Sequence, residues 1–383
     1  MEDKKILNLK FLKTILTLSL ILNLPLLYFG FSSPVTIQRY DPDFYFGVSA
    51  AHANLSIIKE TIDKTSPFTN VFVIGSTGIT YDSEKLNETC QYIYEKELDV
   101  IIYTEKEYYS QLQHQWNDDS KNIWSSHFLG YYVADEPGGK QLDRSVMLVQ
   151  EAESFTDAAQ QYENTFNMIL RWLNYTDNHT NTTLFTSDYA LYWFDYKAGY
   201  DTVFAEFGWN YSRQLNIALN RGAATMQNKD WGVIITWTYN NPPYLESGPE
   251  LYNDLVLAYE NGAKYILIFD SNEDYTQSTL KEEHFEAIEQ FWKYTKDNPR
   301  KSDIEKRVAF VLPEGFGYGF RGPKDKIWGL WEADGLSLEI SYHLGTFLDE
   351  FGPKMDIIYD NRLKTDETYN QYIFWNGTII SNQ

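Results

Sequence analysis

The sequence has very little cysteine and too few basic residues to balance its acids. Of the 383 residues only Cys90 is a cysteine, so the chain can form no internal disulfide and no thiolate cluster for zinc or iron–sulfur. Its 32 Lys and Arg face 54 Asp and Glu, which gives a formal charge of -22. Because such a field repels phosphate backbones, the composition argues against nucleic acid as a partner.

Histidine is also sparse. The six histidines are scattered, and none forms an HExxH or HxH pair. Paired histidines are a usual sequence sign of a catalytic metal, so we expect no metal and no other cofactor. The same absence speaks against a metal-dependent hydrolase of the polysaccharide deacetylase kind.

Aromatic residues, in contrast, are abundant. The chain carries 30 Tyr and 11 Trp, and aromatics make up 17% of all residues. This is more than a core requires, so we expect some of the rings to face a ligand. The length suits a barrel of about 250 residues plus a smaller unit.

Residues 14–31 contain no charge and are long enough, at 18 residues, to span a bilayer. Lysines precede this segment and Asp41 and Asp43 follow it, so the positive-inside rule places residues 1–13 in the cytoplasm and the rest outside. No clear small-x-small cleavage site precedes Ser32, which favours a membrane anchor over a removed signal peptide; cleavage would give a secreted protein. An extracytoplasmic glycoprotein also agrees with N-x-S/T sequons at Asn54, Asn87, Asn174, Asn178, Asn181, Asn210 and Asn376.

From residue 44 onward, short apolar runs alternate with longer amphipathic segments, a pattern typical of repeated strand–helix units around a parallel sheet. The expected helices include 82–96, 144–175, 212–226, 249–261 and 279–297. The apolar runs are residues 44–50, 70–76, 100–105, 128–136, 183–189, 202–207, 232–239 and 265–271. Eight strands close a (β/α)8 barrel, also called a TIM barrel, and we assign it residues 40–298.

A second pattern begins after the polar linker 299–306. Residues 308–312 read as a strand, 336–351 as a helix, and 355–359 and 372–375 as two further strands. This is the start of an open α/β sheet, which about 75 residues cannot complete. Residues 307–383 are therefore predicted to be a partial domain, left short or finished by a partner.

Residues 128–139 end an apolar run with Asp135, Glu136, Pro137 and two glycines. Active sites of such barrels lie where strands end. Side chains alternate along a strand, so we expect only one of the two acids, Glu136, to point into the barrel mouth. The plain alternative is an acidic turn, because Asp, Pro and Gly dominate turns of every kind.

Further acids close other predicted strands: Glu105, Asp188, Glu206 and Asp270. A pair of carboxyl groups suits glycosidic bond hydrolysis, in which one donates a proton and the other attacks the sugar or activates water. Flat rings suit the apolar face of a sugar and polar groups suit its hydroxyls. The candidate substrate-binding residues are Asp135, Asp188, Trp209, Asn210, Trp237, Tyr239 and Asp270.

With this motif, the chain resembles the large clan of retaining (β/α)8 glycoside hydrolases whose fourth strand ends in Asn-Glu-Pro. The matching residues are Asp135-Glu136-Pro137. The resemblance implies that Glu136 is the acid/base, with Asp135 in the place of the asparagine. The clan carries its nucleophile on strand seven, where this chain has Trp237. Glu206 is our preferred substitute because it shares a strand face with Thr202 and Phe204; Glu246 and Asp270 remain open.

The segment from residue 307 resembles the start of the amidotransferase-like, flavodoxin-type domain that follows the barrel in some β-galactosidases, which implies a homo-oligomer. Residues 325–331 are aromatic enough either to pack against the barrel or to reach its rim. The leading hypothesis is a membrane-anchored, outward-facing glycosidase that acts on an oligo- or polysaccharide. The alternative is an inactive carbohydrate-binding or cell-envelope protein on the same scaffold.

Overall fold

The computed structural model describes residues 42, 44–105, 127–176, 182–300, 307–322, 324–360 and 368–382. The predicted anchor, residues 14–31, lies outside this part. Among the helices that are described, none combines the length and the apolar character needed to cross a bilayer.

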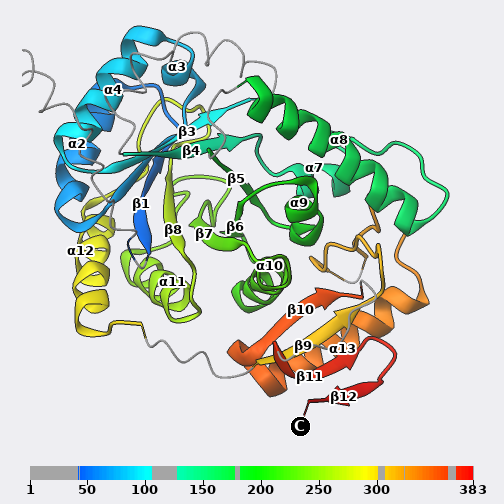
Figure 1. Ribbon diagram of the computed structural model, residues 1–383. Coiled ribbons are helices and arrows are strands. Elements are labelled where there is room, and N and C mark those ends of the chain that lie inside the picture. Colours follow the sequence, from blue (N-terminus) through cyan, green and yellow to red (C-terminus); the bar gives the residue numbers. More distant parts are fainter. Residues whose placement is uncertain are drawn as a thin grey trace, which may run out of the picture. The chain divides into compact units, whose positions relative to one another are not determined.

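Eight parallel strands close into a barrel in chain order, with β1 paired to β8 (Figure 1). The predicted (β/α)8 barrel is confirmed, and each strand lies within two residues of its expected start. The strands are β1 (Tyr45–Ala50), β2 (Val71–Ile74), β3 (Asp99–Thr104), β4 (Phe128–Val133), β5 (Thr183–Asp188), β6 (Thr202–Phe207), β7 (Asp230–Ile235) and β8 (Tyr265–Asp270).

Helices follow the strands and cover the outside of the barrel (Figure 1). Their ends carry the expected signals: Asp82 caps one helix by accepting from the backbone N–H groups of Glu84 and Lys85, and Ser212 caps another. The helices are α2 (Leu55–Thr65), α3 (Thr77–Thr80), α4 (Ser83–Glu95), α7 (Pro137–Leu142), α8 (Phe155–Thr176), α9 (Tyr192–Ala198), α10 (Arg213–Gln227), α11 (Gly248–Glu260) and α12 (Glu282–Asp297).

The predicted helix 144–175 is wrong at its start. Residues 137–142 form the separate short helix α7, and the chain then turns at Arg144, which has a left-handed φ of 59°. The hydroxyl of Ser154 accepts from the N–H of Asp157, so the long helix begins only at Phe155.

Two sets of buried side chains hold the barrel. One fills its interior and includes Tyr45, Tyr132, Phe185, Phe204 and Tyr265, and the other packs strands against helices. Along β4, Tyr132 belongs to the interior while Tyr131 and Val133 belong to the outer set. The alternation expected for a strand therefore holds as far as Val133.

The C-terminal residues form a separate small sheet in the order β10-β9-β11-β12. The predicted strand–helix–strand start is present, while β12 was missed because it has three residues, all exposed. The elements are β9 (Arg307–Leu312), α13 (Gly335–Phe351), β10 (Met355–Tyr359), β11 (Tyr369–Phe374) and β12 (Ile379–Ser381). The first three strands run parallel, and β12 is antiparallel to β11.

Helix α10 joins this sheet to the barrel. Arg221 lies 2.7 Å from the buried carboxylate of Asp356 on β10 and donates to the backbone carbonyls of Pro353 and Met355. A side chain at Gly222 would lie 2.3 Å from the carbonyl oxygen of Ile357, so only glycine allows this approach.

The segment between β9 and α13 packs against α7. Trp328 is fully buried, and its carbonyl accepts a hydrogen bond of 3.0 Å from the side chain of Gln141. Arg321 donates to Asp143 at 2.7 Å and lies over the ring of Tyr189. Of the two alternatives for residues 325–331, packing against the barrel helices is therefore the observed one, while the neighbouring Arg321 extends toward the loop after β5.

Candidate functional site

The chain leaves the strand geometry directly after β4. Ala134 and Glu136 both have left-handed φ angles, of 54° and 51°, which cost free energy for residues with a side chain. Tyr200 and Thr186 donate to the carbonyls of Val133 and Ala134 and hold this turn. Strand alternation thus ends at Val133.

The prediction that only one acid of the pair faces the mouth is wrong for this reason. Asp135 Oδ1 lies 2.7 Å from the hydroxyl of Tyr132, an interior side chain, and 3.2 Å from Ser187 Oγ. Glu136 faces the same group of residues, because its Oε2 lies 3.5 Å from Lys140 Nζ, which is also 3.3 Å from Asp135 Oδ2. Both acids therefore contribute to one cluster.

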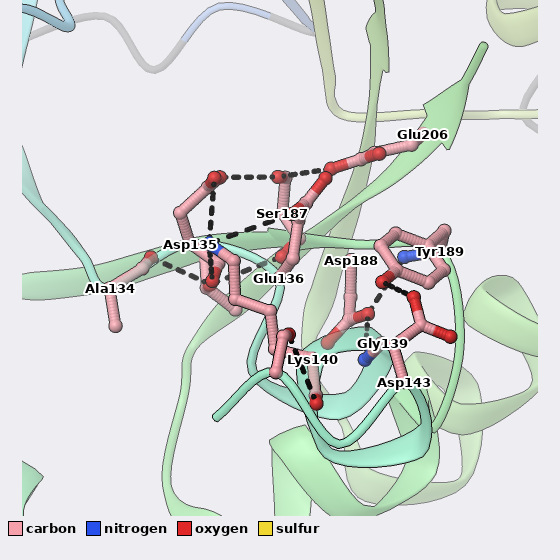
Figure 2. Close-up of polar contacts among 12 residues, drawn as sticks. Ala134, Asp135, Glu136, Gly139, Lys140, Asp143, Ser187, Asp188, Tyr189 and Glu206 are labelled. Atoms are coloured by element: carbon pink, nitrogen blue, oxygen red, sulfur yellow. Dashed lines mark hydrogen bonds and ion pairs between the residues drawn. The ribbon is translucent and has the colours of Figure 1, made fainter. Parts of the chain in front are cut away.

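Ser187 of β5 links the acids of the two neighbouring strands, β4 and β6. Its Oγ lies 2.8 Å from Glu206 Oε1 (Figure 2). The same atom lies 2.7 Å from the Tyr132 hydroxyl. We call Tyr132, Asp135, Glu136, Ser187 and Glu206, together with Lys140, the acid cluster.

Lys140 of α7 brings a positive charge to this cluster. Its Nζ lies 2.8 Å from the carbonyl oxygen of Asp135, 3.3 Å from Asp135 Oδ2 and 3.5 Å from Glu136 Oε2. Burial alone would lower the pKa of Lys140. The negative charges of Asp135 and Glu136 outweigh burial, so the pKa of Lys140 is raised above its ordinary value. Lys140 therefore keeps its charge among the carboxyl groups.

Two carboxyl groups of the cluster, those of Glu136 and Glu206, have raised pKa values. Burial, followed by the charge of Asp135, raises the pKa of Glu136 to about 7. Burial, followed by the charge of Glu136, raises the pKa of Glu206 well above its ordinary value. A carboxyl group that is protonated near neutral pH can act as a general acid.

The acids that end β5 and β8 have a different place. Asp188 is fully buried and accepts from the backbone N–H groups of Gly138, Gly139, Tyr189 and Ala190 at 2.5 to 3.1 Å. Asp270 is also fully buried and accepts from Ser278 and from the N–H of Thr279. Both carboxylates fasten loops, and their role in substrate binding stays a prediction.

The predicted aromatic platform lies after β7. Trp237 is half-buried and donates to the carbonyl of Ser271 at 2.8 Å, with the rings of Tyr244 and Phe269 at 5.4 and 5.8 Å. Its carbonyl accepts from the N–H of Trp209, so the two tryptophans adjoin. Tyr239 is 45% exposed, and Asn210 is exposed.

Sequence reasoning missed four residues of this region. Tyr132 and Ser187 share strand faces with Gly130 and Phe185, so parity could have indicated them, and Lys140 stands one helical turn after Glu136. Tyr275, 53% exposed, has its centroid 6.3 Å from that of Trp237. Burial and then the charges of Asp135 and Glu136 raise the pKa of Tyr275.

Two clefts lie away from the acid cluster. One is lined by residues of α8 and α9 and by residues that follow β9 and β10, including Glu163, Lys197 and Glu314. The other lies at the opposite end of the barrel, where Asp201, Thr202 and Asp230 begin β6 and β7. Neither contains a group of carboxyls with raised pKa of the kind found at the mouth. Within the described residues, no group of three or more His, Cys, Asp or Glu is arranged to hold a metal ion.

Comparison with known proteins gives a fold relationship. The structure is similar to a β-galactosidase from the psychrophilic Marinomonas ef1, with a TM-score of 0.56 and 10% identity over 86% of this chain and 72% of that one. It is also similar to a polyextremophilic β-galactosidase from the Antarctic haloarchaeon Halorubrum lacusprofundi, with a TM-score of 0.54 and 9% identity over 86% and 69%. No protein-family profile and no curated protein sequence matches the chain. The resemblance to (β/α)8 glycoside hydrolases thus holds at the level of fold.

Proposed function

We propose that the protein is a glycoside hydrolase that cleaves an oligo- or polysaccharide with two carboxyl groups of the acid cluster. The observation that carries the proposal is the acid cluster at the carboxyl end of the barrel strands, where Ser187 links Asp135 to Glu206 and Lys140 contacts both Asp135 and Glu136. Burial raises the pKa of Glu136 in this cluster to about 7. This is the end at which barrels of this fold perform chemistry. The fold shared with β-galactosidases supports the proposal.

In this proposal, Glu136 gives its proton to the leaving glycosidic oxygen and later takes a proton from water. Glu206 is the second group and acts in its ionised form on the anomeric carbon, which corresponds to a retaining reaction. After burial, the charge of Glu136 is the main cause of the raised Glu206 pKa, so a proton on Glu136 favours the ionised form of Glu206. Ser187 and Tyr132 hold Glu206 and Asp135 in place. The rings of Trp237 and Tyr275 receive the apolar face of a sugar.

The test is a screen of aryl glycosides and oligosaccharides with the wild type, Glu136→Gln and Glu273→Gln. Glu273 is an exposed acid of the loop after β8, so its substitution removes a charge from the same end of the barrel without touching the cluster. The wild type and Glu273→Gln should hydrolyse the same substrates, and Glu136→Gln should be slower by a factor on the order of 10² to 10⁴. Equal rates for all three proteins would contradict the proposal.

A second candidate is a carbohydrate-binding protein without catalysis. It is favoured by the end of β7, where the chain has Trp237 instead of an acid, and by the 5% exposure of Glu206. This candidate predicts that wild type and Glu136→Gln bind the same glycans equally and that neither turns them over. Calorimetric titration with the glycans of the same panel separates the two functions.

We further propose that residues 14–31 anchor the protein with its barrel outside the cytoplasm, and that residues 307–383 support self-association. The uncharged 18-residue segment and the preceding lysines support the first proposal. Membrane fractionation with protease protection tests it, and light scattering of the soluble part tests the second. Release of the full chain into the soluble fraction would refute the anchor. A strictly monomeric mass would refute self-association.

A further inference from the structure

We propose that Asp188 is a positioning residue that sets the place of the Glu136 carboxyl group; this inference rests on the proposed function of Glu136 as proton donor. Asp188 ends β5, whereas Glu136 lies in the loop after β4. The two are joined through the first turn of α7, as Figure 2 shows for Asp188 and Gly139.

Helix α7 starts in an unusual way. Its N-cap residue is Glu136, with left-handed backbone angles and no capping hydrogen bond from its own side chain. The first N–H groups of a helix need an acceptor, which the N-cap side chain normally supplies. Here Asp188 supplies it, at 2.5 Å from the N–H of Gly138 and 2.8 Å from that of Gly139. The Glu136 carboxyl group is thereby free to face the acid cluster.

The same carboxylate fixes the neighbouring loop. Asp188 Oδ1 also accepts from the N–H groups of Tyr189 and Ala190, at 2.8 and 3.1 Å. A second link runs from the N–H of Glu136 to the carbonyl of Ser187, at 3.0 Å. The loops after β4 and β5 are therefore one unit with Asp188 at its centre.

The two glycines after Pro137 are required by this contact. A Cβ added at Gly139 would lie 2.1 Å from the ring of Tyr189. A Cβ added at Gly138 would lie 2.7 Å from the Cβ of Leu191 and 2.9 Å from Asp188 Oδ2. Side chains at Gly138 and Gly139 would push α7 away from Asp188. The close approach of the loops after β4 and β5 thus explains why two glycines follow Pro137.

Asp188 is placed to keep its charge. Its pKa is about 6, because burial raises it more than the four backbone N–H groups lower it. Behind it, Asp195 of α9 is also fully buried and accepts from the Tyr162 hydroxyl at 2.6 Å. Burial and the charge of Asp188 raise the pKa of Asp195 well above its ordinary value. The Asp188 charge also contributes to the raised pKa of Glu136.

The test compares Asp188→Asn with Asp270→Asn. Asp270 is the matched control because it is equally buried and fastens the loop after β8, away from Glu136. Asp188→Asn should lower kcat by about 100-fold with little change in KM, as expected for a displaced catalytic group. It should also shift the high-pH limb of kcat/KM to lower pH. Asp270→Asn should leave the position of that limb unchanged.

A titration of Glu136 by carboxyl-detected NMR tests the inference without activity. Its midpoint near pH 7 should fall in Asp188→Asn and stay in Asp270→Asn. Equal Glu136 midpoints in the wild type and both variants would overturn the inference. If the wild type turns over no glycan but the Glu136 midpoint still falls in Asp188→Asn, only the proposed function is overturned.

If Asp188→Asn does not fold, Gly139→Ala displaces the same loop while Asp188 is retained. It should lower kcat and leave KM nearly unchanged, and the Glu136 midpoint should move. Unchanged kcat and midpoint in a folded Gly139→Ala protein would also contradict the inference.

Discussion

The two halves of the barrel mouth differ in chemistry. Strands β4 to β6 deliver the acid cluster, whereas the segments after β7 and β8 deliver the rings of Trp237, Tyr244 and Tyr275. The difference does not follow from where acids occur in the sequence, because β8 also ends in one. It arises because Oδ1 of Asp270 accepts from the Ser278 hydroxyl and the Thr279 N–H and its Oδ2 lies 3.5 Å from the buried His52, whereas Asp135 and Glu206 both contact Ser187. Proton transfer and contact with an apolar sugar face are thus expected on opposite sides.

The largest effect that would test this division is the loss of the second carboxyl group. Glu206→Gln should lower kcat/KM by a factor on the order of 10² to 10⁴, because its ionised form is needed in each turnover. The control is Glu246→Gln. Glu246 is also buried, but it follows β7 and lies 3.4 Å from Arg213. A greater loss in the control would move the second carboxyl group to the aromatic half and break the comparison.

The next effect concerns the aromatic half. Trp237→Ala should raise KM by about tenfold with a smaller change in kcat, because aromatic contacts contribute about 1 kcal/mol. Trp237→Phe keeps a ring, so its KM should lie between those of the wild type and Trp237→Ala. Steady-state kinetics on one oligosaccharide measures both constants. A loss in kcat alone would show that the ring takes part in the chemistry instead.

A smaller effect follows from the raised pKa values. Glu136, at about 7 against an ordinary 4.5, binds its proton more tightly when folded than when unfolded. Its contribution to stability is therefore fully present below about pH 4.5 and is lost as the pH rises through about 7. The free energy of unfolding should fall between pH 5 and 8, and Glu136→Gln should reduce that fall by on the order of 1 to 3 kcal/mol. Urea denaturation at pH 5 and pH 8 measures the free energy of unfolding of each protein. An equal fall in the wild type and in Glu136→Gln would refute the raised pKa of Glu136.

The smallest effects are expected at the exposed predicted residues. Asn210→Ala and Tyr239→Phe should change kcat/KM by less than about twofold, because substitutions at exposed sites usually cost under 0.5 kcal/mol. A tenfold loss in either variant would extend the sugar-binding region beyond the half-buried rings. The same kinetic assay decides this.

Regular strands were predictable and the ends of strands were not. The alternation that put Phe204 in the barrel interior also placed Glu206 at the mouth, since β6 continues to Phe207. The same rule failed for Asp135, because β4 stops at Val133 and two left-handed residues follow. Local sequence does not indicate φ at Ala134, which depends on partners such as Thr186 on the next strand.

Partners distant in sequence also decided the fate of the other acids. Asp188 and Asp270 look like Glu206 in the sequence, since each follows an apolar strand. What separates them is the supply of backbone N–H groups from loops, 50 residues away in the case of Gly138. The short β12 escaped prediction for a related reason: with no buried face, it is defined only by its pairing with β11.

The contact between Gln141 and Trp328 has a consequence for the order in which the protein is made. The helix that follows Glu136 is held by a carbonyl 187 residues further along the chain. During synthesis, the barrel strands up to Asp270 emerge well before this carbonyl does. The loop that carries the proposed acid therefore reaches its final hydrogen bonding only after most of the polypeptide has left the ribosome. A chain that ends in the linker 299–306 would contain every predicted catalytic residue but would lack the Trp328 carbonyl that holds α7.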